Sequence, residues 1–527
     1  MRRLAGLIAP LVVGAVAVVA AWSAMLPGLA FWDTGEFQVV APLLGTAHPT
    51  GYPTYVLLGW LANLILAPFG EPAFRMNLFA GLSVGVAAAV TTDLARTLTR
   101  STPLGVLAGL GLALTPAVWA IGTRADAHAL HLALLAILLR LLVGWEDARR
   151  RATDGEPGEP GRRADDRRAD RWLLAATFVF GLSVGNHSLT LLLALPVGLY
   201  VLAVQPGIVR RPRLVLSCLA VLVGTVVLVF LELPLRAGPF RADLVYGRPE
   251  TWEGFWYIVL AQQFQGSLID PFGDLAGKTA GLATRAIGQF GVLAALIPAG
   301  LVTAIIVRPR YALLTGTAMG ITIFFAASYA NADIGRYYLG PILIAWTWIA
   351  ILVRALIDAV LGPAAIDPLG AGTVRRRPGL RPAAALGVLA LAVLLVPTAL
   401  AVPDRHARVD ARGETDARQW VDAAFDAMEP DALVVSWWSY STPLWYAQHV
   451  EGRRPDIRIV DDRTRLDDDL GDYDDVIDAN LSSRPVYVIR DDPTEIEALS
   501  ERYRLAPVLG PNARFLVRVL GPREPAS

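Results

Sequence analysis

The sequence predicts an α-helical polytopic membrane protein with about 11 transmembrane helices, followed by a small α/β domain. Hydrophobic residues make up 54% of the 527 residues. Apolar runs recur at lengths that cross roughly 30 Å of hydrocarbon as a helix. After Pro403 the composition becomes that of a soluble protein. We therefore divide the chain into a transmembrane domain, 1–402, and a C-terminal domain, 403–527.

The distribution of arginine predicts the topology. Segment 52–68 is the ambiguous one, because it is apolar but short and opens with Tyr52-Pro53. If it lies in the interface or is re-entrant, every arginine cluster falls on the cytoplasmic side, and if it spans, all of them face outward. The first alternative leaves these spans: 4–30, 75–95, 103–120, 128–144, 172–186, 188–204, 214–234, 287–307, 311–329, 337–357 and 383–402.

This topology predicts a multi-pass protein of the plasma (inner) membrane with a cytoplasmic N-terminus and an extracytoplasmic C-terminal domain. The cytoplasmic loop 145–171 is rich in Pro, Gly and charge and is expected to be disordered. In the C-terminal domain, strands are expected within 431–441, 457–462, 484–491 and 513–520, and helices within 414–428 and 493–503. The formal net charge of zero gives no support for a nucleic-acid partner.

The predicted outer loops, chiefly 31–74 and 236–286, hold most of the polar residues of the membrane region. Ionisable groups near hydrocarbon are costly unless they have a function. Their gathering on one face indicates a site that opens to the extracytoplasmic side. These residues are Asp33, Glu36, His48, Arg124, Asp126, Asn186, His187, Arg236, Asp333 and Arg336.

Asp33 and Glu36 are the candidate catalytic residues. Three positions apart, they would share a face of a helical turn, where one carboxylate can act as a base while the other orients a group or binds a cation. A helix N-terminal cap explains the same spacing equally well. Metal dependence is open, because two acids can hold Mg²⁺ or Mn²⁺ but an arginine can neutralise a phosphate without a metal.

The other candidates are substrate-binding residues. His48 and Tyr52 lie in a stiff segment with two prolines that can hold a side chain over a cavity. Asn186 and His187 lie at the mouth between two spans. Arg236 is expected to bind a lipid phosphate, helped by Arg336, because an arginine at the outer headgroup level can hold a phosphate bidentately. Either arginine can instead snorkel or pair with a nearby acid.

Several ordered motifs resemble a known family, the multi-spanning proteins once catalogued as domain of unknown function 2723 and now associated with protein O-mannosyltransferase-like enzymes. In the motif AVWAIGTRADAHAL, the family often carries Glu and Tyr where this chain has Asp126 and His128. The motifs are WDTGEF (32–37), AHPTGYPTY (47–55), RMN (75–77), AVWAIGTRADAHAL (117–130), GLSVGNHSLTLLLALP (181–196), and LPLR followed by YGRPETW (233–252).

That family is similar to the GT-C membrane glycosyltransferases. The resemblance implies an inverting transfer of a sugar, mannose in the family, from a polyprenyl-phosphate donor to an extracytoplasmic protein Ser/Thr or a glycan. It also implies that Asp33 and Glu36 lie in the catalytic first outer loop and that Asp126 belongs to the site.

Two other classes of protein fit parts of the sequence. A lipid-linked sugar transporter or flippase should place ionisable groups at mid-membrane and show repeat symmetry. A non-catalytic scaffold would explain the C-terminal domain but not the acids of the first outer loop.

Overall fold

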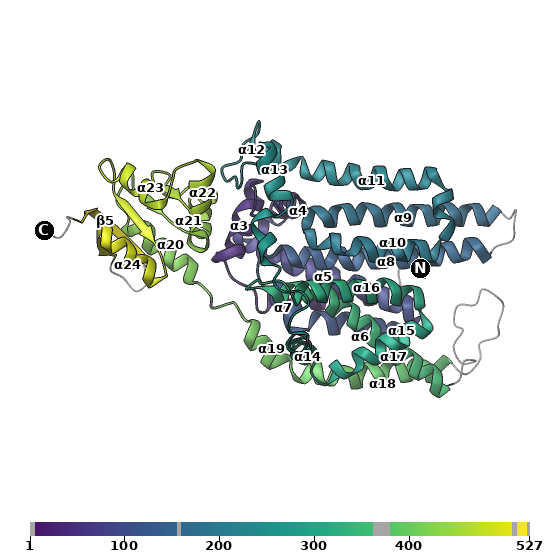
Figure 1. Ribbon diagram of the computed structural model, residues 1–527. Coiled ribbons are helices and arrows are strands. Elements are labelled where there is room, and N and C mark those ends of the chain that lie inside the picture. The colour runs from purple at the N-terminus through teal and green to yellow at the C-terminus, as the bar shows by residue number, and fades with distance from the viewer. Residues whose placement is uncertain (1–5, 155–159, 362–379, 509–513, 524–527) are drawn as a thin grey trace.

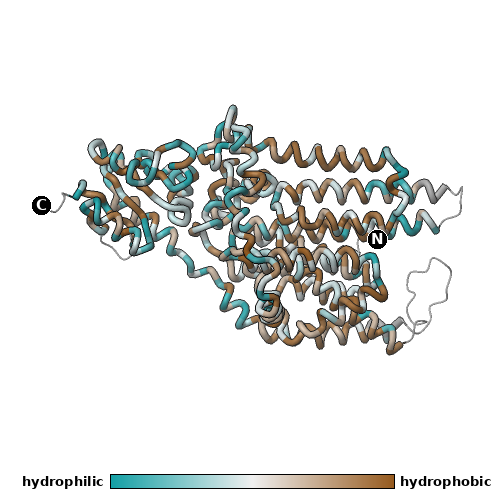
Figure 2. Tube along the Cα trace, viewed as in Figure 1, coloured by the Kyte–Doolittle hydropathy of each residue, from teal (hydrophilic) through white to brown (hydrophobic). Residues whose placement is uncertain are grey.

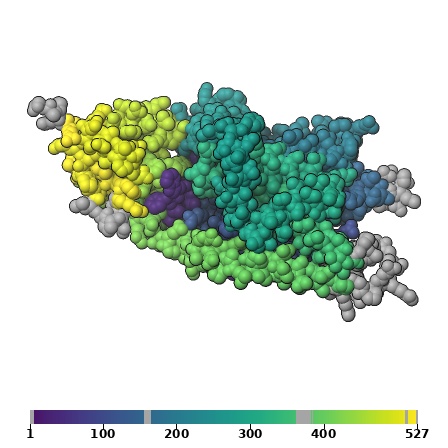
Figure 3. Space-filling view, turned by 60° about the horizontal axis from the view of Figure 1, so that its bottom comes forward, coloured from purple at the N-terminus to yellow at the C-terminus, as the bar shows by residue number. Residues whose placement is uncertain are grey.

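The computed structural model describes residues 6–154, 160–361, 380–508 and 514–523. Most of the helices lie side by side, and a smaller region of strands and helices lies at one end of them (Figure 1). The Kyte–Doolittle colouring is mostly brown along these helices and mixed with teal in the smaller region (Figure 2). Helix α18 (Leu380–Leu400) and helix α19 (Val402–Val409) run along the edge of the molecule toward that smaller region (Figure 3).

The remaining helices of the first four hundred residues differ widely in length, from 6 residues in α7 to 28 residues in α5. The longer ones are α2 (Ile8–Trp22), α3 (Trp32–Leu43), α4 (Pro53–Ile65), α5 (Pro72–Thr99), α6 (Thr102–Ala113), α8 (Ala127–Asp154), α9 (Pro160–Asn186), α10 (Ala194–Val204), α11 (Pro212–Phe230), α14 (Leu275–Phe290), α15 (Leu296–Val307), α16 (Pro309–Ala326) and α17 (Leu339–Leu361). The shorter ones are α7 (Pro116–Ile121), α12 (Glu232–Ala237) and α13 (Trp252–Val259), with 3₁₀ turns η2 (Ser188–Leu193), η4 (Gln262–Ser267), η5 (Gly291–Ala295) and η6 (Ile334–Tyr338).

Five of the described helices are long and apolar enough to cross a membrane, or six if the bent pair α18–α19 counts as one span. Several predicted spans, among them 4–30 and 103–120, contain shorter apolar helices. A multi-pass membrane protein is therefore supported, and the number of eleven spans stays a prediction. The ambiguous segment 52–68 holds α4, one face of which is buried.

The prediction of a disordered loop over 145–171 is wrong for its described part. Helix α8 continues to Asp154 and α9 begins at Pro160, and 155–159 lie outside the described residues. The charged side chains that suggested disorder pair with one another: Arg149 contacts Asp166 across the two helices, and Arg211 forms two hydrogen bonds to Asp170. Composition alone cannot reveal these ion pairs, which stabilise the polar ends of the helices. The similar segment 362–379 also lies outside the described residues.

The C-terminal residues form a five-stranded sheet in the order β2-β1-β3-β5-β4. Strands β1 (Leu433–Val435), β2 (Arg458–Val460), β3 (Val486–Ile489) and β5 (Leu516–Pro522) fall where the sequence predicts strands. Strands β1, β2 and β3 are parallel, and β5 pairs antiparallel with β3 and β4 (Tyr503–Pro507). Five helices accompany the sheet: α20 (Asp416–Ala427), α21 (Trp438–Trp445), α22 (Asp462–Asp467), α23 (Tyr473–Asn480) and α24 (Pro493–Arg502).

Helix α3 packs directly against this C-terminal region. A Cβ at Gly35 would lie 2.7 Å from Oγ1 of Thr442 in α21 and would also collide with the Ala30 carbonyl, so the glycine permits the close approach. The hydroxyl of Tyr446 accepts a 2.9 Å hydrogen bond from the Ala73 amide. Trp32 and Trp437 meet edge to face, with ring centroids 5.2 Å apart. Segment 31–74, the predicted first outer loop, therefore lies between the long helices and the C-terminal sheet.

Candidate functional site

Arg336 is the centre of a cluster with three carboxylates, which we call the carboxylate–arginine cluster (Asp33, Asp126, Asp333 and Arg336). Nη1 lies 3.1 Å from Oδ2 of Asp33, Nε lies 3.3 Å from Oδ2 of Asp126, and Nη2 lies 2.9 Å from Oδ2 of Asp333. Turn η6 supplies the arginine, the first turn of α3 supplies Asp33, and the residue before α8 supplies Asp126. Segments far apart in the sequence thus meet at one guanidinium group.

The three carboxylates differ in exposure. The side chain of Asp126 is 5% exposed, that of Asp33 is 30% exposed and that of Asp333 is 58% exposed. Although burial favours the neutral acid, the Arg336 guanidinium lowers the pKa of Asp126 to about 2. Asp126 is therefore the fixed anionic partner of the arginine, and the other two can exchange with solvent or a ligand.

Glu36 lies beside this cluster but has a different partner, His48. One carboxylate oxygen contacts Nδ1 of His48, and the other accepts a 2.7 Å hydrogen bond from the His48 amide. On the far side of the ring, Nε2 lies 3.2 Å from the Tyr52 hydroxyl. Burial opposes the charged imidazolium, but the Glu36 carboxylate outweighs it and raises the pKa of His48 to about 9.

His187 and His128 meet on the next side of the site, with ring centroids 4.7 Å apart. His128 also faces Asp126, with Nδ1 at 3.1 Å from Oδ1, while its buried Nε2 has no hydrogen-bond partner among the residues that the structure describes. His187 accepts a hydrogen bond from the Leu189 amide through Nδ1. Asn186 lies behind them, where its amide donates to the Ala127 carbonyl at 3.0 Å and holds α9 against the start of α8.

These side chains surround a cavity of about 70 Å³. Asp33, His48, Tyr52, His187 and Arg336, all predicted from the sequence, line it directly. Glu36, Asp126 and Asn186 lie behind the lining residues that they contact. Several further residues line it that were not predicted as substrate-binding residues, among them His128, Phe264, Tyr329 and Tyr337.

An apolar cavity continues from the same arginine. Its volume is about 20 Å³, it shares Arg336 and Tyr337 with the polar cavity, and its wall is otherwise mostly apolar, with His131 and Thr322 as the other polar side chains. The apolar residues are Leu135, Leu189, Leu193, Ala318 and Ile344. A polar chamber and an apolar slot thus meet at one guanidinium, which is the arrangement that an amphipathic ligand requires.

Arg236 does not line either cavity. Its guanidinium donates to the backbone carbonyls of Leu43 and Leu44, at 3.0 and 2.9 Å, where α3 ends. A helix end leaves such carbonyls without intrahelical partners, so Arg236 caps α3. Its predicted role in binding phosphate stays a prediction, and the geometry favours Arg336.

A buried amide network that sequence reasoning missed supports the site. Asn77 and Gln38 hydrogen-bond to each other at 2.9 Å, and the Asn77 carbonyl oxygen accepts from the Ala125 amide at 2.9 Å. Gln38 bonds to Gly28 and Ala30 just before α3. Both side chains are fully buried, so the network holds the residues before Asp33 and Asp126 in register. Gln38 and Asn77 could have been selected from the sequence, because each is an amide side chain beside apolar residues.

The two acids do not converge as metal ligands. Asp33 contacts Arg336 and Glu36 contacts His48, so each carboxylate already has a different partner. No group of three or more His, Cys, Asp or Glu side chains in the described ranges has a geometry that would hold a metal ion. We therefore derive no step through Mg²⁺ or Mn²⁺.

Comparison with known proteins agrees with the motifs. Residues 33–207 match the family model described as the N-terminal domain of the protein O-mannosyl-transferase TMEM260. The mouse (Mus musculus) protein O-mannosyl-transferase TMEM260 is 28% identical over 482 residues, which cover 85% of this chain. The match spans 62% of the length of that relative.

Solved structures extend the likeness to nearly the whole chain. ArnT from Cupriavidus metallidurans bound to undecaprenyl phosphate matches with a TM-score of 0.56 at 15% identity, covering 96% of this chain and 97% of ArnT. The oligosaccharyltransferase AglB from Archaeoglobus fulgidus, in complex with an inhibitory peptide and a dolichol-phosphate, matches with a TM-score of 0.53 at 14% identity, covering 91% of this chain and 69% of AglB. The resemblance seen in the motifs is thus confirmed over residues 33–207 by the TMEM260 family model, and the chain shares its fold with ArnT and AglB.

Proposed function

We propose that this protein is an inverting glycosyltransferase that moves a sugar from a polyprenyl-phosphate-linked donor to an acceptor hydroxyl on the extracytoplasmic side. The observation that carries this proposal is the position of Arg336 between a polar chamber and an apolar slot, with Asp33 on its Nη1. Both structural relatives were solved with a polyprenyl-type phosphate bound, which supports a donor of that class.

Arg336 is the proposed phosphate-binding residue. A planar guanidinium can donate two parallel hydrogen bonds to a phosphate and stabilise the charge that develops on it as the glycosidic bond breaks. Three carboxylates around one arginine leave a formal excess of negative charge, so a phosphate has to replace one of them. Asp333 is the one to leave, because its side chain is the most exposed of the three.

Asp33 is the proposed general base. The acceptor oxygen attacks the anomeric carbon on the face opposite the phosphate, and the bond between that carbon and the phosphate oxygen breaks. The bonding electrons leave with the polyprenyl phosphate, and the proton of the acceptor hydroxyl passes to Asp33. Glu36 positions His48, and we propose that His48, Tyr52 and His187 contact the sugar.

The apolar slot is the proposed path of the prenyl chain next to the phosphate. The polar cavity, at about 70 Å³, and the apolar slot, at about 20 Å³, are both smaller than the ~300–1,000 Å³ that ligand pockets typically have. Donor binding therefore requires movement of the side chains that cover it, such as Phe264 and Tyr329. Mannose as the sugar and a protein Ser/Thr as the acceptor follow the name of the mouse relative and belong to this proposal.

The test is donor turnover by the purified protein in lipid, with polyprenyl-phosphate mannose as the first donor. Asp33→Asn is expected to lower turnover by roughly 10²–10⁴-fold, the usual contribution of a general base. The variant must keep the thermal unfolding midpoint of the wild type. Wild-type turnover that survives unchanged in Asp33→Asn would remove Asp33 from the mechanism, and tight donor binding without turnover by the wild type would favour a lipid-linked sugar transporter.

A further inference from the structure

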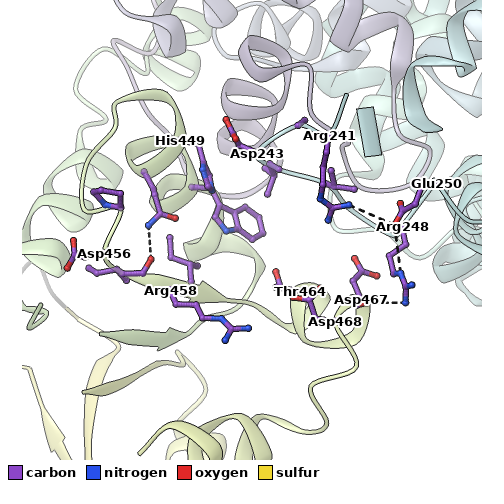
Figure 4. Close-up of a pocket in the computed structure, with 18 of the residues that line it drawn as sticks. Arg241, Asp243, Arg248, Glu250, His449, Asp456, Arg458, Thr464, Asp467 and Asp468 are labelled. Atoms are coloured by element: carbon purple, nitrogen blue, oxygen red, sulfur yellow. Dashed lines mark hydrogen bonds and ion pairs between the residues drawn. The ribbon is translucent and has the colours of Figure 1, made fainter. Parts of the chain in front are cut away.

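A second, larger cavity lies between the outer segment 241–250 and the C-terminal sheet, and we call it the interface cleft. Its volume of about 730 Å³ lies within the range of typical ligand pockets. Figure 4 shows Arg241, Asp243, Arg248 and Glu250 on one side and Asp456, Arg458, Thr464 and Asp467 on the other. The site described above uses none of these residues.

One wall of the cleft includes an edge strand. Strand β2 is at the end of the sheet and pairs only with β1, and both Arg458 and Ile459 line the cleft. The Arg458 amide donates to the Ala432 carbonyl, and the Val460 carbonyl accepts from the Ser436 amide, so residues 458 and 460 direct their backbone groups toward β1. In a parallel pair the intervening residue points the other way. The N–H and C=O of Ile459 therefore face away from β1, and neither has a hydrogen-bond partner among the described residues. Ile459 is 8% exposed, and the Ile457 carbonyl accepts from Gln448, so this edge offers one residue for backbone pairing.

The rims of the cleft are tied together by polar contacts. The Gly247 amide donates to Oδ2 of Asp467 at 2.8 Å, and the Arg248 guanidinium lies 3.8 Å from Asp469. The Arg463 guanidinium lies over the ring of Tyr257, 4.6 Å from its centroid. The two walls are therefore held at a defined separation by contacts at one end of the cleft.

The charges of the lining favour a cationic ligand. Six carboxylates and three arginines line the cleft, and several of them pair with each other or with arginines behind them. In the described part of the chain, Asp243 and Asp468 have no ion-pair partner, and Arg458 has none either. The unpaired carboxylates thus outnumber the unpaired arginine.

The cleft lies next to the chamber of the carboxylate–arginine cluster. Trp438 is in edge contact with His48, which lines the chamber, at a ring-centroid distance of 5.6 Å. The same tryptophan lies 6.3 Å from Trp445, which lines the cleft. Trp445 and Trp438 thus connect the cleft to the chamber through ring contacts.

We propose that the interface cleft binds an extended polypeptide segment of the acceptor that bears lysine or arginine and pairs with the free edge of β2. Backbone hydrogen bonds to an exposed edge supply affinity for any extended chain, and pockets beside the strand supply selectivity. The proposal rests on the transferase function only in identifying the bound polypeptide as the sugar acceptor. Peptide binding is a separate measurement from donor turnover.

The test uses a fluorescein-labelled peptide of alternating valine, threonine and lysine, with the full-length protein in lipid nanodiscs and fluorescence anisotropy as the readout. Ile459→Pro removes the one N–H that faces the cleft, and proline is tolerated on an edge strand. We expect at least tenfold weaker peptide binding by Ile459→Pro and wild-type binding by the matched control Ile459→Val. Asp243→Asn is expected to weaken binding several-fold at low salt. All three variants should retain wild-type donor hydrolysis without acceptor.

A second probe keeps the test decisive if Ile459→Pro does not fold. The same peptide with N-methyl groups on alternate amides keeps every side chain but cannot pair along one edge, so the wild-type protein should bind it at least tenfold more weakly. Equal binding of the two peptides would overturn the proposal, as would full competition by a neutral oligosaccharide such as maltoheptaose. Absence of donor turnover in every variant, with peptide binding as expected, would defeat the proposed function and leave the peptide site standing.

Discussion

The guanidinium of Arg336 reaches the carboxylate of Asp33 across 303 positions of the sequence, with Nη1 at 3.1 Å from Oδ2. The contact joins the first outer segment to the turn before α17. The two residues, one a candidate for phosphate binding and the other for base catalysis, therefore lie in the same site. The proposed phosphate-binding arginine and the proposed general base are therefore in direct contact.

The first prediction distinguishes the two candidate arginines. Arg336→Lys replaces the planar fork by a point charge and should lower donor kcat/KM by roughly ten- to a hundredfold, the cost of losing a charged hydrogen bond. The measurement is donor turnover over a range of donor concentrations.

Arg236→Lys is the matched control, because it makes the same change at the cap of α3. It should lower the thermal unfolding midpoint and leave donor KM unchanged. A loss of donor affinity in Arg236→Lys that equals the loss in Arg336→Lys would restore Arg236 as a phosphate ligand.

The second prediction concerns the three carboxylates around Arg336. Asp333→Asn removes the exposed carboxylate that competes with the phosphate, so donor KM should fall several-fold while kcat changes little. Asp126→Asn removes the buried partner that orients both Arg336 and His128, and should raise KM and lower kcat. Steady-state kinetics of the two variants measure both effects, and equal changes in both would contradict the difference in role.

Much of this site could be predicted from the sequence, because its residues stand out against apolar surroundings. The motifs WDTGEF and AHPTGYPTY indicate Asp33, Glu36, His48 and Tyr52 as neighbouring site residues from the sequence alone, because polar residues are few in the predicted first outer loop. The sequence analysis favours Arg236 over Arg336 as the phosphate ligand, whereas the geometry favours Arg336. Each arginine lies beside an apolar helix end, and only the fold shows that one faces the carbonyls of Leu43 and Leu44.

Other features that the sequence did not predict also depend on contacts between distant segments. Composition predicted disorder over 145–171, where the ion pairs of Arg149 and Arg211 depend on how α8, α9 and α11 lie together. The C-terminal strands were found because their runs of Val and Ile are local signals. Their order in the sheet, which leaves β2 at an edge, is set by pairing between strands far apart in the chain.

The third prediction concerns pH. The pKa of His48 is raised to about 9 in the folded protein by Glu36, above its ordinary value of 6.5. A raised folded-state pKa contributes stability that is fully present below pH 6.5 and is lost as the pH rises through about 9. The temperature at the midpoint of thermal unfolding should therefore decrease as the pH is raised from 7 to 9.5.

Glu36→Gln removes the carboxylate that raises the pKa and should flatten this dependence, while also lowering stability at pH 7. The control is Glu253→Gln, an exposed acid of α13, which should leave the slope unchanged. A slope of the same size in Glu36→Gln would show that His48 is not its source.

The fourth prediction tests the packing of the first outer segment on the C-terminal region. Gly35→Ala places a methyl group 2.7 Å from Oγ1 of Thr442 and against the Ala30 carbonyl, which is a backbone atom and cannot rotate away. Overpacking of this kind costs about 1–3 kcal/mol. Because α3 carries Asp33, the displaced helix should also lose the contact with Arg336, so donor turnover should fall together with stability.

Gly198→Ala is the matched control, since the same methyl group in α10 meets nothing within 4 Å and should be neutral or stabilise by about 0.5–1 kcal/mol. Thermal unfolding in lipid and donor turnover, measured on both variants, separate the two effects. Full activity in a destabilised Gly35→Ala variant would show that the packing of α3 against Thr442 supports the fold but does not set the position of Asp33. Loss of both would show that the C-terminal region holds the catalytic carboxylate in place, and would give residues 403–527 a role in the reaction in addition to the one proposed for the interface cleft.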